Sequence, residues 1–593
     1  MFDKITEHFI DDKRPMFMHK VRGKYMHISF AKMKADVDNI ALGLAALGIK
    51  RGDNIALISE NRPEWVVADM GMIKLGAVNV SIYPTLTPKQ MEYILNDSGA
   101  KIVIVSNQHQ LIKLMKIIQN VPTLQRILIM TEHEIESDPR VIPFSRVKEI
   151  GNEFGKLYPD YLLNEVNKIN PEHIITIIYT SGTTGNPKGV MLTHNNLVSN
   201  IKAASECIPF TYEDTVLSFL PLCHSYERMA GYYTAMSCGS TIAYAEGIET
   251  VRDNLLEVHP TFVTTVPRLF ERFYNRIMKQ VGEESAVRQK IFSWAIGVGK
   301  TYMCAKRNKV MSPFISLQYK VANKLVFKKI RERTGGQIRF FVSGGAALAP
   351  ELGEFFDAVG IPIIEGYGMT ESSPVISANR KDDYKFGTVG RPLSGVEVEI
   401  AADGEILVRG PNVMKGYWNN KKATEEIIDT DGWLHTGDIG MFDSEGYLKI
   451  TDRKKHLFVS SGGKNIAPQH IENIFLQSEF IDQFVLIGDG KMYLTALIVP
   501  NFDSLKDFAD RHGIKYDTPE ELSGNPEIYK LLEGVMSKLQ KDLANYERVR
   551  KFTILGKPLT IENNELTPTL KVKRKVVEER FKELIDKMYQ GVN

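Results

Sequence analysis

The first third of the chain alternates short apolar runs with segments of helical spacing. Asn54 to Ile58 and Lys101 to Val105 are compact apolar runs bounded by turn residues, a pattern typical of buried strands. Ile40 to Leu47 and Trp65 to Leu75 show helical spacing instead, and Gly76 closes the second of these segments. Strands and helices in alternation predict sheets that carry helices on both faces, the arrangement of an α/β protein.

A glycine-rich loop follows one of the predicted strands. Ile174 to Tyr179 is a β-branched run that leads directly into YTSGTTGNPKG, Tyr179 to Gly189. Glycines let backbone N–H groups approach phosphate oxygens, the hydroxyl side chains add donors, and Lys188 adds positive charge. The ending of a Walker A loop is missing, because Lys188 is followed by Gly189. The loop therefore predicts a phosphate site of another kind.

The segment 276–333 is predicted to be helical and basic. It holds 14 Lys/Arg against 3 Glu, a local excess of +11. Its GVGKT sequence, Gly297 to Thr301, ends like a Walker A loop, but Trp294 takes the place of the first glycine and the surrounding spacing is helical. We therefore do not interpret GVGKT as a nucleotide site. Two interpretations of the charge stay open: a solvated helical face of an inserted subdomain, or a surface that docks to anionic lipid headgroups.

Beyond residue 400 the predicted elements become short strands separated by glycine turns. DRKKHLFVSSGGKN, Asp452 to Asn465, mixes charge, glycine and serine, as expected where two domains join. The residues after it include two strand-like runs, Phe484 to Ile487 and Leu494 to Val499, and two helical segments, Pro526 to Tyr546 and Val576 to Tyr589. This is enough for a small α/β domain.

Composition narrows the class of protein. A chain of 593 residues is too long for one core, and 43% hydrophobic with 25% charged residues is ordinary for a globular protein. The net charge of +2 gives no indication of nucleic-acid binding. Four cysteines without a CxxC spacing argue against a zinc or redox site and favour a reducing cytoplasm. We find neither a secretory h-region nor a run of about 18 apolar residues, so we expect no spanning helix.

Several motifs, in a fixed order along most of the chain, resemble the signatures of the adenylate-forming superfamily, which includes acyl-CoA synthetases, luciferases and peptide-synthetase adenylation domains. They are YTSGTTGNPKG (179–189), EGYGMTE (365–371), GEILVRGPNVMKGYW (404–418), GWLHTGD (432–438), DRKK (452–455) and ELTPTLKVKRK (565–575). The resemblance implies an α/β protein with a large multi-subdomain N-terminal region, 1–452, whose mixed and parallel sheets are covered by helices and accompanied by a distorted barrel. A small mobile α/β domain, 453–593, follows.

The resemblance also assigns catalytic roles. Lys571 is the expected catalytic lysine, which bridges the attacking carboxylate and the α-phosphate; Leu570 precedes it where the commoner family form has glycine, and Lys573 and Lys575 are neighbouring candidates. Glu371 is the expected catalytic carboxylate, as the ligand of Mg²⁺. His224, in LPLCHSYER, is expected beside the acyl carboxylate.

The expected nucleotide and CoA contacts come from the same resemblance. Asp438 and Arg453 are expected to meet the ribose from either side of the domain junction, with Lys455 as the hinge. Tyr367 is expected to stack on adenine, and Gly462 and Gly463 to border the pantetheine channel. The other expected binding residues are Thr180, Ser181, Gly182, Thr183, Thr184, Gly185, Lys188, Gly344, Gly345, Ala346, Glu365, Gly366, Gly368 and Thr370.

The reaction implied has two halves: fatty acid and Mg-ATP give acyl-AMP and pyrophosphate, and the thiol of CoA then displaces AMP. VPRLFER, Val266 to Arg272, and the basic helical insertion resemble the long-chain fatty-acid CoA ligases. We therefore expect ATP, Mg²⁺ and CoA as cofactors, and a long-chain fatty acid as substrate. We expect no nucleic-acid partner in this cytoplasmic protein; peripheral contact with an anionic membrane stays open, and the sequence does not indicate an oligomeric state.

Two alternatives remain at this point. One is a ligase that passes the acyl group to the phosphopantetheine of a carrier protein. The other is a non-catalytic nucleotide- or lipid-binding relative, against which the presence of Glu371, Asp438, Arg453 and Lys571 argues.

Overall fold

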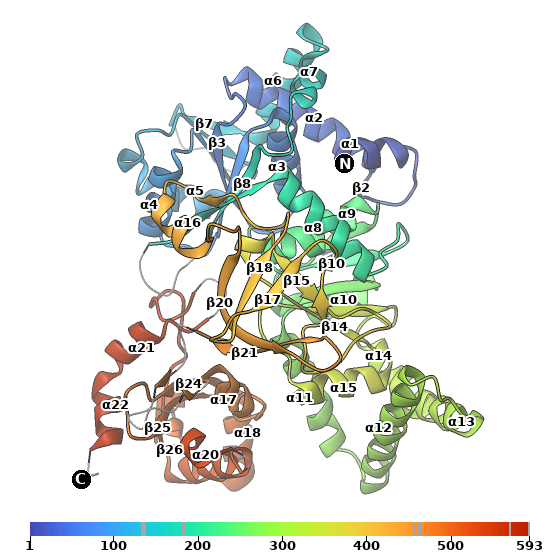
Figure 1. Cartoon of the computed structure of the whole chain (residues 1–593), viewed down its shortest axis with the longest axis vertical. Coiled ribbons are helices and arrows are strands. Elements are labelled where there is room, and N and C mark those ends of the chain that lie inside the picture. The colour runs from blue at the N-terminus through green and yellow to red at the C-terminus, as the bar shows by residue number, and fades with distance from the viewer. Residues whose placement is uncertain are drawn as a thin grey trace. The chain divides into compact units, whose positions relative to one another are not determined.

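The chain forms two compact units in the computed structural model, which describes residues 1–131, 138–180, 186–454, 458–459, 465–466, 468–541, 543–567 and 571–590 (Figure 1). Unit 1 comprises Met1–Glu399, Leu407–Thr436 and Phe442–Lys449. Unit 2 comprises Ile400–Ile406, Gly437–Met441 and Ile450–Asn593.

An eight-stranded sheet forms the first half of unit 1, in the order β19-β9-β8-β4-β3-β5-β6-β7. Its central strands are parallel and wholly buried, as expected where helices cover both faces. The glycine loop leaves β8 and returns as β9, which is antiparallel to β8. The strands are β3 (Asn54–Ile58), β4 (Val78–Ile82), β5 (Ile102–Val105), β6 (Arg126–Ile129), β7 (Val141–Pro143), β8 (Ile174–Thr180), β9 (Lys188–Thr193) and β19 (Gly416–Tyr417).

The helices of this half pack tightly. A Cβ on Gly151 would lie 1.8 Å from the carbonyl oxygen of Asn39, so α6 can approach α2 only with glycine there. The predicted helix Ile40 to Leu47 is the second half of α2, which begins at Phe30. The helices are α1 (Phe2–His8), α2 (Phe30–Ala46), α3 (Pro63–Leu75), α4 (Pro88–Ser98), α5 (Gln108–Met115), the 3₁₀ turn η1 (Ile118–Asn120), α6 (Phe144–Leu157), α7 (Tyr161–Asn167), α8 (His194–Cys207) and, near β19, α16 (Lys421–Ile427).

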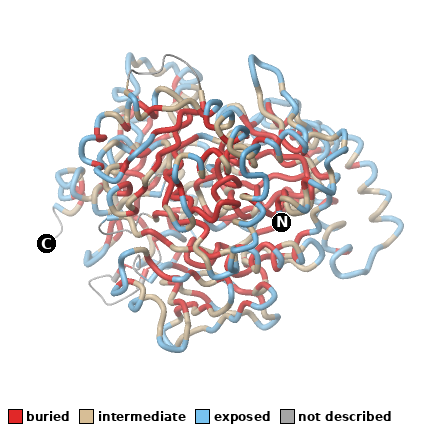
Figure 2. The backbone as a smooth tube through the Cα atoms, turned by 90° about the horizontal axis from the view of Figure 1, so that it is seen from above, coloured by how far each residue is buried: buried red, intermediate tan, exposed pale blue. Residues whose placement is uncertain are grey.

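A nine-stranded sheet forms the second half of unit 1, in the order β16-β15-β14-β13-β12-β10-β11-β1-β2. Strands β10 to β14 and β1 run parallel, and β2, β15 and β16 add antiparallel edges. The strands are β1 (Phe17–Val21), β2 (Lys24–Ile28), β10 (Thr215–Ser218), β11 (Thr241–Tyr244), β12 (Phe262–Thr265), β13 (Phe340–Ser343), β14 (Ile363–Gly368), β15 (Val375–Ala378) and β16 (Arg391–Pro392). Figure 2 shows the buried residues concentrated inside the fold and the exposed ones around it.

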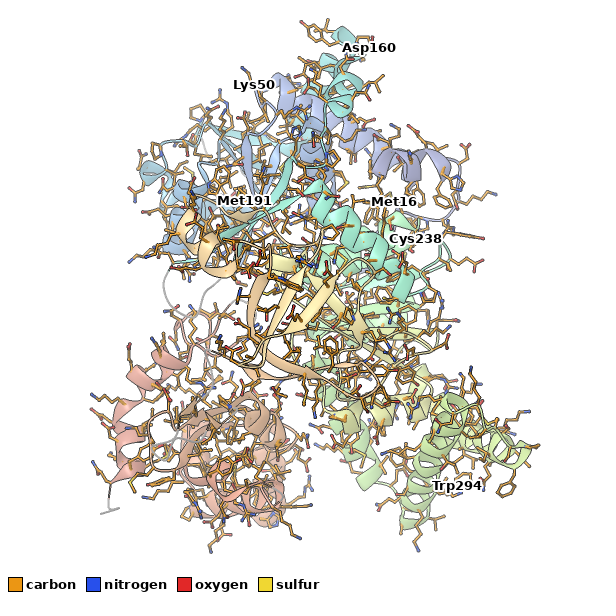
Figure 3. All side chains as sticks on the ribbon, in the orientation of Figure 1. Met16, Lys50, Asp160, Met191, Cys238 and Trp294 are labelled. Carbon is orange, nitrogen blue, oxygen red and sulfur yellow. The ribbon has the colours of Figure 1, made fainter. Side chains whose placement is uncertain are left out.

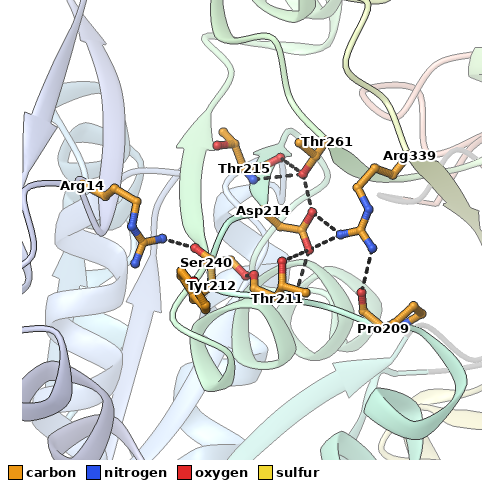
Figure 4. A network of polar contacts seen from close by, with 9 residues as sticks. All are labelled: Arg14, Pro209, Thr211, Tyr212, Asp214, Thr215, Ser240, Thr261 and Arg339. Carbon is orange, nitrogen blue, oxygen red and sulfur yellow. Dashed lines mark hydrogen bonds and ion pairs between the residues drawn. The ribbon is translucent and has the colours of Figure 1, made fainter.

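Three strands of this sheet begin at one buried carboxylate (Figure 4). Asp214, Thr261 and Arg339 each stand immediately before a strand, β10, β12 and β13. Asp214 accepts a 2.6 Å hydrogen bond from the Thr261 hydroxyl and contacts of 2.6 and 2.7 Å from Nη1 of Arg339. The Asp214 carboxylate therefore holds the starts of β10, β12 and β13 together.

The segment 276–333 is helical over most of its length, from the end of α11 through α12, α13 and η4 to α14. GVGKT lies inside α12, so it is not a strand-to-helix phosphate loop. The helices of this half are the π-helix η2 (Glu227–Tyr233), α9 (Thr234–Ser237), the 3₁₀ turn η3 (Ile248–Thr250), α10 (Val251–Val258), α11 (Pro267–Gly282), α12 (Ala286–Arg307), α13 (Pro313–Ala322), the π-helix η4 (Asn323–Phe327), α14 (Lys328–Glu332), α15 (Pro350–Val359) and the 3₁₀ turn η5 (Thr370–Ser372).

Unit 2 contains a three-stranded sheet, β24-β25-β26, with helices around it. The predicted helix Pro526 to Tyr546 is shorter than expected, because α20 ends at Leu539; the predicted helix Val576 to Tyr589 is interrupted at Phe581, whose backbone leaves the helical region. The elements are β24 (Ile481–Ile487), β25 (Leu494–Pro500), β26 (Val549–Ile554), α17 (Pro468–Phe475), α18 (Phe502–His512), α19 (Pro519–Ser523), α20 (Pro526–Leu539), η6 (Asn545–Glu547), α21 (Arg574–Arg580) and α22 (Lys582–Tyr589).

At the place where the resemblance implies a distorted barrel, the described strands form a four-stranded sheet in the order β17-β18-β20-β21. These strands are β17 (Glu397–Ile400), β18 (Glu405–Arg409), β20 (Leu434–Phe442) and β21 (Leu448–Arg453), and a short pair, β22 (Phe458–Val459) and β23 (Asn465–Ile466), follows. The expected α/β class, with mixed and parallel sheets and a separate C-terminal α/β domain, is confirmed.

One buried ion pair connects the elements at the centre of unit 1. The Arg228 guanidinium in η2 donates to the carboxylate of Asp69 in α3, and both side chains are almost fully buried. Its Nη1 also donates to Thr176 in β8, at 2.7 Å, and to Ser81 in β4, at 3.0 Å. Three elements of the first half are thereby joined to η2.

We predict that Arg228→Met destabilises the protein by about 3–5 kcal/mol, because it leaves the Asp69 carboxylate buried without its cation. The matched control is Arg146→Met, since Arg146 forms an exposed pair with Glu149 at 2.8 Å and such pairs contribute at most about 1 kcal/mol. Urea unfolding of the three proteins checks this. Equal midpoints for the two variants would contradict it.

Candidate active site

The phosphate loop begins and ends in a paired strand. Thr180, the last residue of β8, pairs with Lys188, the first residue of β9. Met191, which Figure 3 labels, also lies in β9. Ser181 to Gly185 lie outside the described residues. The ammonium of Lys188 lies 5.0 Å from the centre of the Tyr417 ring, a cation–π distance. Lys188 is therefore held over the short strand β19.

Tyr417 connects that lysine to the expected metal ligand. Its hydroxyl donates a 2.8 Å hydrogen bond to Oε1 of Glu371, and both residues are buried. Burial, and then the nearby Glu371 carboxylate, raise the pKa of Tyr417, so the hydroxyl keeps the proton that it donates. The sequence does not predict this role, although Tyr417 lies in the GEILVRGPNVMKGYW motif. Spacing alone does not show that a strand residue reaches a carboxylate 46 positions away.

The 3₁₀ turn η5, which contains Glu371, also contacts the segment of His224, the histidine expected near the acyl group. The hydroxyls of Thr370 and Ser225 lie 3.1 Å apart, which places the His224–Ser225 turn against η5. Nδ1 of His224 accepts the backbone N–H of Tyr226 at 3.1 Å, so in the neutral ring Nε2 carries the proton. The ring also meets the edge of Tyr83, with centroids 6.4 Å apart. His224 is thus oriented from two sides.

Tyr226 extends the contacts to the turn after β13. Its hydroxyl donates to the carbonyl of Val342 at 2.9 Å, and its ring lies so close that a Cβ on Gly344 would be only 3.0 Å away. Gly345 has a φ of 80°, in the left-handed region that favours glycine. Ala346 follows with an exposed side chain. The turn 344–346 is therefore shaped by steric limits on its glycines.

The EGYGMTE strand supplies a buried acceptor. Glu365 pairs in register with Ser343, and its Oε1 is buried without a hydrogen-bond partner among the described residues. Burial raises the pKa of Glu365 to about 8, while N–H groups of Leu348 and Gly387 act against the rise. An acceptor oxygen of this kind suits an N–H donor of a ligand. Tyr367, two residues further along β14, is buried.

Gly368 has a packing reason rather than a ligand reason. A Cβ there would lie 1.8 Å from the carbonyl oxygen of Pro374, so no other residue fits this position. Gly368 is expected from the resemblance to bind the nucleotide, and this steric requirement is compatible with that expectation.

A polar cavity of about 330 Å³ opens beside Lys188. Asp97 organises its wall: it accepts a 2.5 Å hydrogen bond from the hydroxyl of Tyr179, and its carbonyl accepts the Trp418 indole N–H at 3.0 Å. The lining residues are Tyr93, Asp97, Asn186, Pro187, Lys188, Gly189, Trp418, Asn419 and Asn420. The described end of the glycine loop, Asn186 to Gly189, therefore lines a polar cavity whose other residues the sequence did not indicate.

Unit 2 holds a second group of expected residues. Nε of Arg453 lies 2.8 Å from Oδ1 of Asp438, which is buried, whereas Arg453 is exposed. The backbone N–H of Gly437 donates to Glu405 at 2.9 Å, and Lys454 pairs with the same carboxylate at 2.9 Å. Asp438 and Arg453 were expected on either side of a domain junction; both lie within unit 2.

Lys571 lies in the field of that ion pair. Although the residue keeps exposed surface, surrounding protein atoms desolvate its ammonium, and together with the Arg453 cation they lower the pKa of Lys571 to about 8. Asp438 acts in the opposite direction. Lys573 instead donates to Asn564 at 2.5 Å. Of these two lysines, only Lys571 has a pKa that the Asp438–Arg453 pair influences.

Some expected residues cannot be compared with the structure. Lys455, Gly462 and Gly463 lie outside the described residues, as does the centre of the phosphate loop. Within the described part of the chain, no three His, Cys, Asp or Glu side chains gather into a metal cage. The single buried carboxylate of Glu371 fits Mg²⁺, which usually takes one or two carboxylates together with substrate phosphates and water.

Family models match nearly the whole chain. The model described as AMP-binding enzyme matches residues 9–418, and that described as AMP-binding enzyme C-terminal domain matches residues 455–593. The chain therefore belongs to the AMP-binding enzyme family, and the expected membership of the adenylate-forming superfamily is confirmed.

Two relatives of the chain are named as enzymes that join long-chain fatty acids to CoA. The chain is 34% identical over 592 residues to a long-chain-fatty-acid–CoA ligase, FadD15, of Mycobacterium bovis, covering 99% of this chain and 96% of that one. It is 35% identical to peroxisomal long chain acyl-CoA synthetase 7 of Arabidopsis thaliana, covering 96% and 82%.

Solved structures of low identity confirm the fold. The anthranilate CoA ligase AuaEII in complex with anthranoyl-AMP superposes with a TM-score of 0.74 at 20% identity, covering 99% of this chain and 98% of that one. O-succinylbenzoate CoA synthetase of Bacillus subtilis in complex with AMP gives 0.64 at 21% identity, covering 96% and 97%.

We predict that Tyr417→Phe weakens Mg-ATP binding about ten- to a hundredfold, because hydrogen bonds to charged groups contribute about 1.5–3 kcal/mol. The variant keeps the ring under Lys188 and removes only the hydroxyl that holds Glu371. Calorimetric titration with Mg-ATP measures the loss, and Tyr93→Phe, on the cavity wall, is the control. Equal affinities of Tyr417→Phe and the wild type would show that the hydrogen bond does not position Glu371.

Proposed function

We propose that this protein is an AMP-forming long-chain fatty-acid CoA ligase. It activates the fatty acid with ATP to give acyl-AMP and pyrophosphate, and then transfers the acyl group to CoA with release of AMP. The observation that carries adenylation is the line of contacts Lys188–Tyr417–Glu371, followed by Thr370–Ser225 and His224. It brings a phosphate-binding cation, a metal-binding carboxylate and a donor for the substrate carboxylate into one region. The names of the relatives support the long-chain acid.

The residues of unit 1 have the following proposed roles. Lys188, with Thr180 and Ser181 to Gly185, binds the phosphates that leave as pyrophosphate. Glu371 holds Mg²⁺, which when bound neutralises phosphate charge. His224 directs its Nε2 proton at the acid's carboxylate. Tyr367 and the turn 344–346 enclose the adenine, and Glu365 accepts from its amino group.

The residues of unit 2 complete the reaction. Asp438 accepts hydrogen bonds from the ribose hydroxyls and Arg453 supports it. Lys571 bridges the attacking carboxylate and an α-phosphate oxygen, which reduces repulsion between two anions in the transition state. Gly462 and Gly463 border the passage for the pantetheine arm of CoA. We propose that the domain boundary lies at Asp452 and Arg453, that Lys455 is the hinge, and that the C-terminal domain moves between the two half-reactions.

We further propose a cytoplasmic protein with peripheral membrane contact. All four cysteines are free, which suits a reducing compartment. Among the described residues, no helix is both long and apolar enough to cross a bilayer.

Incubation with palmitate, Mg-ATP and CoA tests the function directly. We expect AMP and palmitoyl-CoA in equal amounts. Accumulation of palmitoyl-AMP without thioester would instead point to transfer onto a carrier protein. Absence of pyrophosphate release with fatty acids of every chain length would exclude adenylation.

We predict that Lys571→Ala lowers the rate of adenylation at least about a thousandfold but leaves thioester formation from supplied acyl-AMP within about threefold, since Lys571 acts only where two anions must meet. Quenched single-turnover assays measure the two steps separately. Lys573→Ala is the matched control and should change neither step. Equal losses in both half-reactions would refute this division of roles.

The pKa of Lys571 predicts a pH dependence. The group is protonated below about 8 in the free enzyme and neutral above, so kcat/KM for adenylation should fall as pH rises through this value. Lys571→Arg stays charged throughout, so its kcat/KM should be lower but should not show this fall. Pyrophosphate-release rates between about pH 6.5 and 9.5 check both profiles. The same alkaline fall in both proteins would assign it to another group.

A further inference from the structure

An apolar stripe runs along the outside of the helical insertion. Phe314 and Leu317 are 67% and 62% exposed, and Val321 and Leu325 follow at 44% and 48%. They lie three and four residues apart on the continuous helical run α13–η4, so they share one side of it. We call these four residues the α13 stripe. Scattered exposed apolar residues are common, but four on successive turns are a continuous patch.

The opposite side of the same run is firmly fixed to unit 1. Tyr319 stacks on Tyr302 of α12 with centroids 3.9 Å apart, and Ala322 and Phe327 are fully buried in the core. The helix therefore has an inner apolar face that folding uses and an outer one that it leaves exposed. Figure 1 shows α12 and α13 extending from the second sheet of unit 1, and Figure 3 marks Trp294 on α12.

The charge around the stripe has one sign. Residues 285–331 contain 11 Lys/Arg and no Asp or Glu. Where the insertion meets α15 the cations are paired, Lys300 with Glu354 at 2.8 Å and Arg307 with Asp357 at 3.1 Å. Beside the stripe, Lys320 and Lys324 are exposed, and in the described part of the chain neither forms an ion pair with a carboxylate.

These two features together select the occupant. A second copy of the chain would bring the same positive charge to the contact and be repelled. An anionic bilayer offers an apolar phase for the stripe and negative headgroups for the lysines, as for amphipathic helices that lie in the membrane interface. We infer that the α13 stripe docks this protein on anionic membranes. The inference extends the peripheral contact proposed above and identifies the face that makes it; a bilayer is also where a long-chain acid partitions.

Vesicle co-sedimentation of the full-length protein tests the inference, with vesicles of phosphatidylcholine alone and of phosphatidylcholine with about a third phosphatidylglycerol. We expect binding to the anionic vesicles and much weaker binding to the neutral ones. Lys320→Gln with Lys324→Gln should lower the partition coefficient about 30-fold, since each basic residue contributes roughly a fivefold factor. Phe314→Ser with Leu317→Ser should lower it at least about tenfold.

The matched control is Leu157→Ser with Leu163→Ser, at the end of α6 and in α7. These leucines are 74% and 61% exposed, but the charges near them in the sequence are mixed, Lys156 with Glu153 and Asp160, so the patch lacks uniformly basic surroundings. The control should bind vesicles like the wild type. All the substituted side chains are exposed, so we expect every variant to unfold at the wild-type temperature. Thermal unfolding of each variant checks that its folding is intact.

Each contrary result overturns the inference. If the α13 variants bind anionic vesicles as well as the wild type does, the stripe is not the docking face. If the wild type binds no vesicles but self-associates in sedimentation experiments through Phe314 and Leu317, the face belongs to a second copy. No ATP or CoA is present in the vesicle assay, so failure of docking is read separately from failure of the proposed ligase activity.

Discussion

The buried Arg228–Asp69 pair is the interaction on which the first unit depends. A guanidinium removed from water is tolerated only when its donors find acceptors, and here β4, β8 and α3 supply them together. The backbone of Arg228 also donates to the carbonyl of His224 at 3.0 Å. The strand that leads to the phosphate loop and the turn that carries His224 are therefore tied to one cation. Their separation is set by the core and not by a surface loop.

The glycines of the motifs serve packing as much as ligand binding. A Cβ on Gly189 would lie 2.8 Å from the Ile177 side chain and 3.2 Å from Trp418, so this glycine lets β8, β9 and β19 close together. The same holds outside the motifs, since a Cβ on Gly390 would lie 2.0 Å from the Ala378 backbone. A phosphate site built from backbone N–H groups needs such close strands, because any shift of the strands moves every donor at once. The packing of these strands by itself requires glycine at position 189.

The sequence predicted what local pattern determines. The sequence predicts Asn54–Ile58 and the core of β5 because a parallel strand covered on both faces is a nearly continuous apolar run. The sequence does not predict the start of α2, because Lys32, Lys34 and Asp36 break the apolar spacing there. Lys32 pairs with Asp36 within the helix, and Asp36 also accepts a hydrogen bond from Lys148 in α6. Tyr417 and Asp97 were missed for a related reason: their roles arise from partners far along the chain. Family motifs located Glu371 and Asp438, but only the fold shows what holds them.

The charge on Lys571 links unit 2 to one half of the proposed cycle. The loss of hydration, and then the Arg453 cation, disfavour the protonated form of Lys571. The Lys571 ammonium is therefore stabilised most when anions surround it. In the proposed cycle, Lys571 faces a carboxylate and a triphosphate during adenylation. After pyrophosphate leaves, the carboxylate has become a neutral mixed anhydride and the nucleotide retains about one negative charge. The attraction that holds Lys571 to the nucleotide therefore falls as a result of the chemistry itself. In the proposed cycle, the first half-reaction removes the interaction that must be broken before CoA can enter.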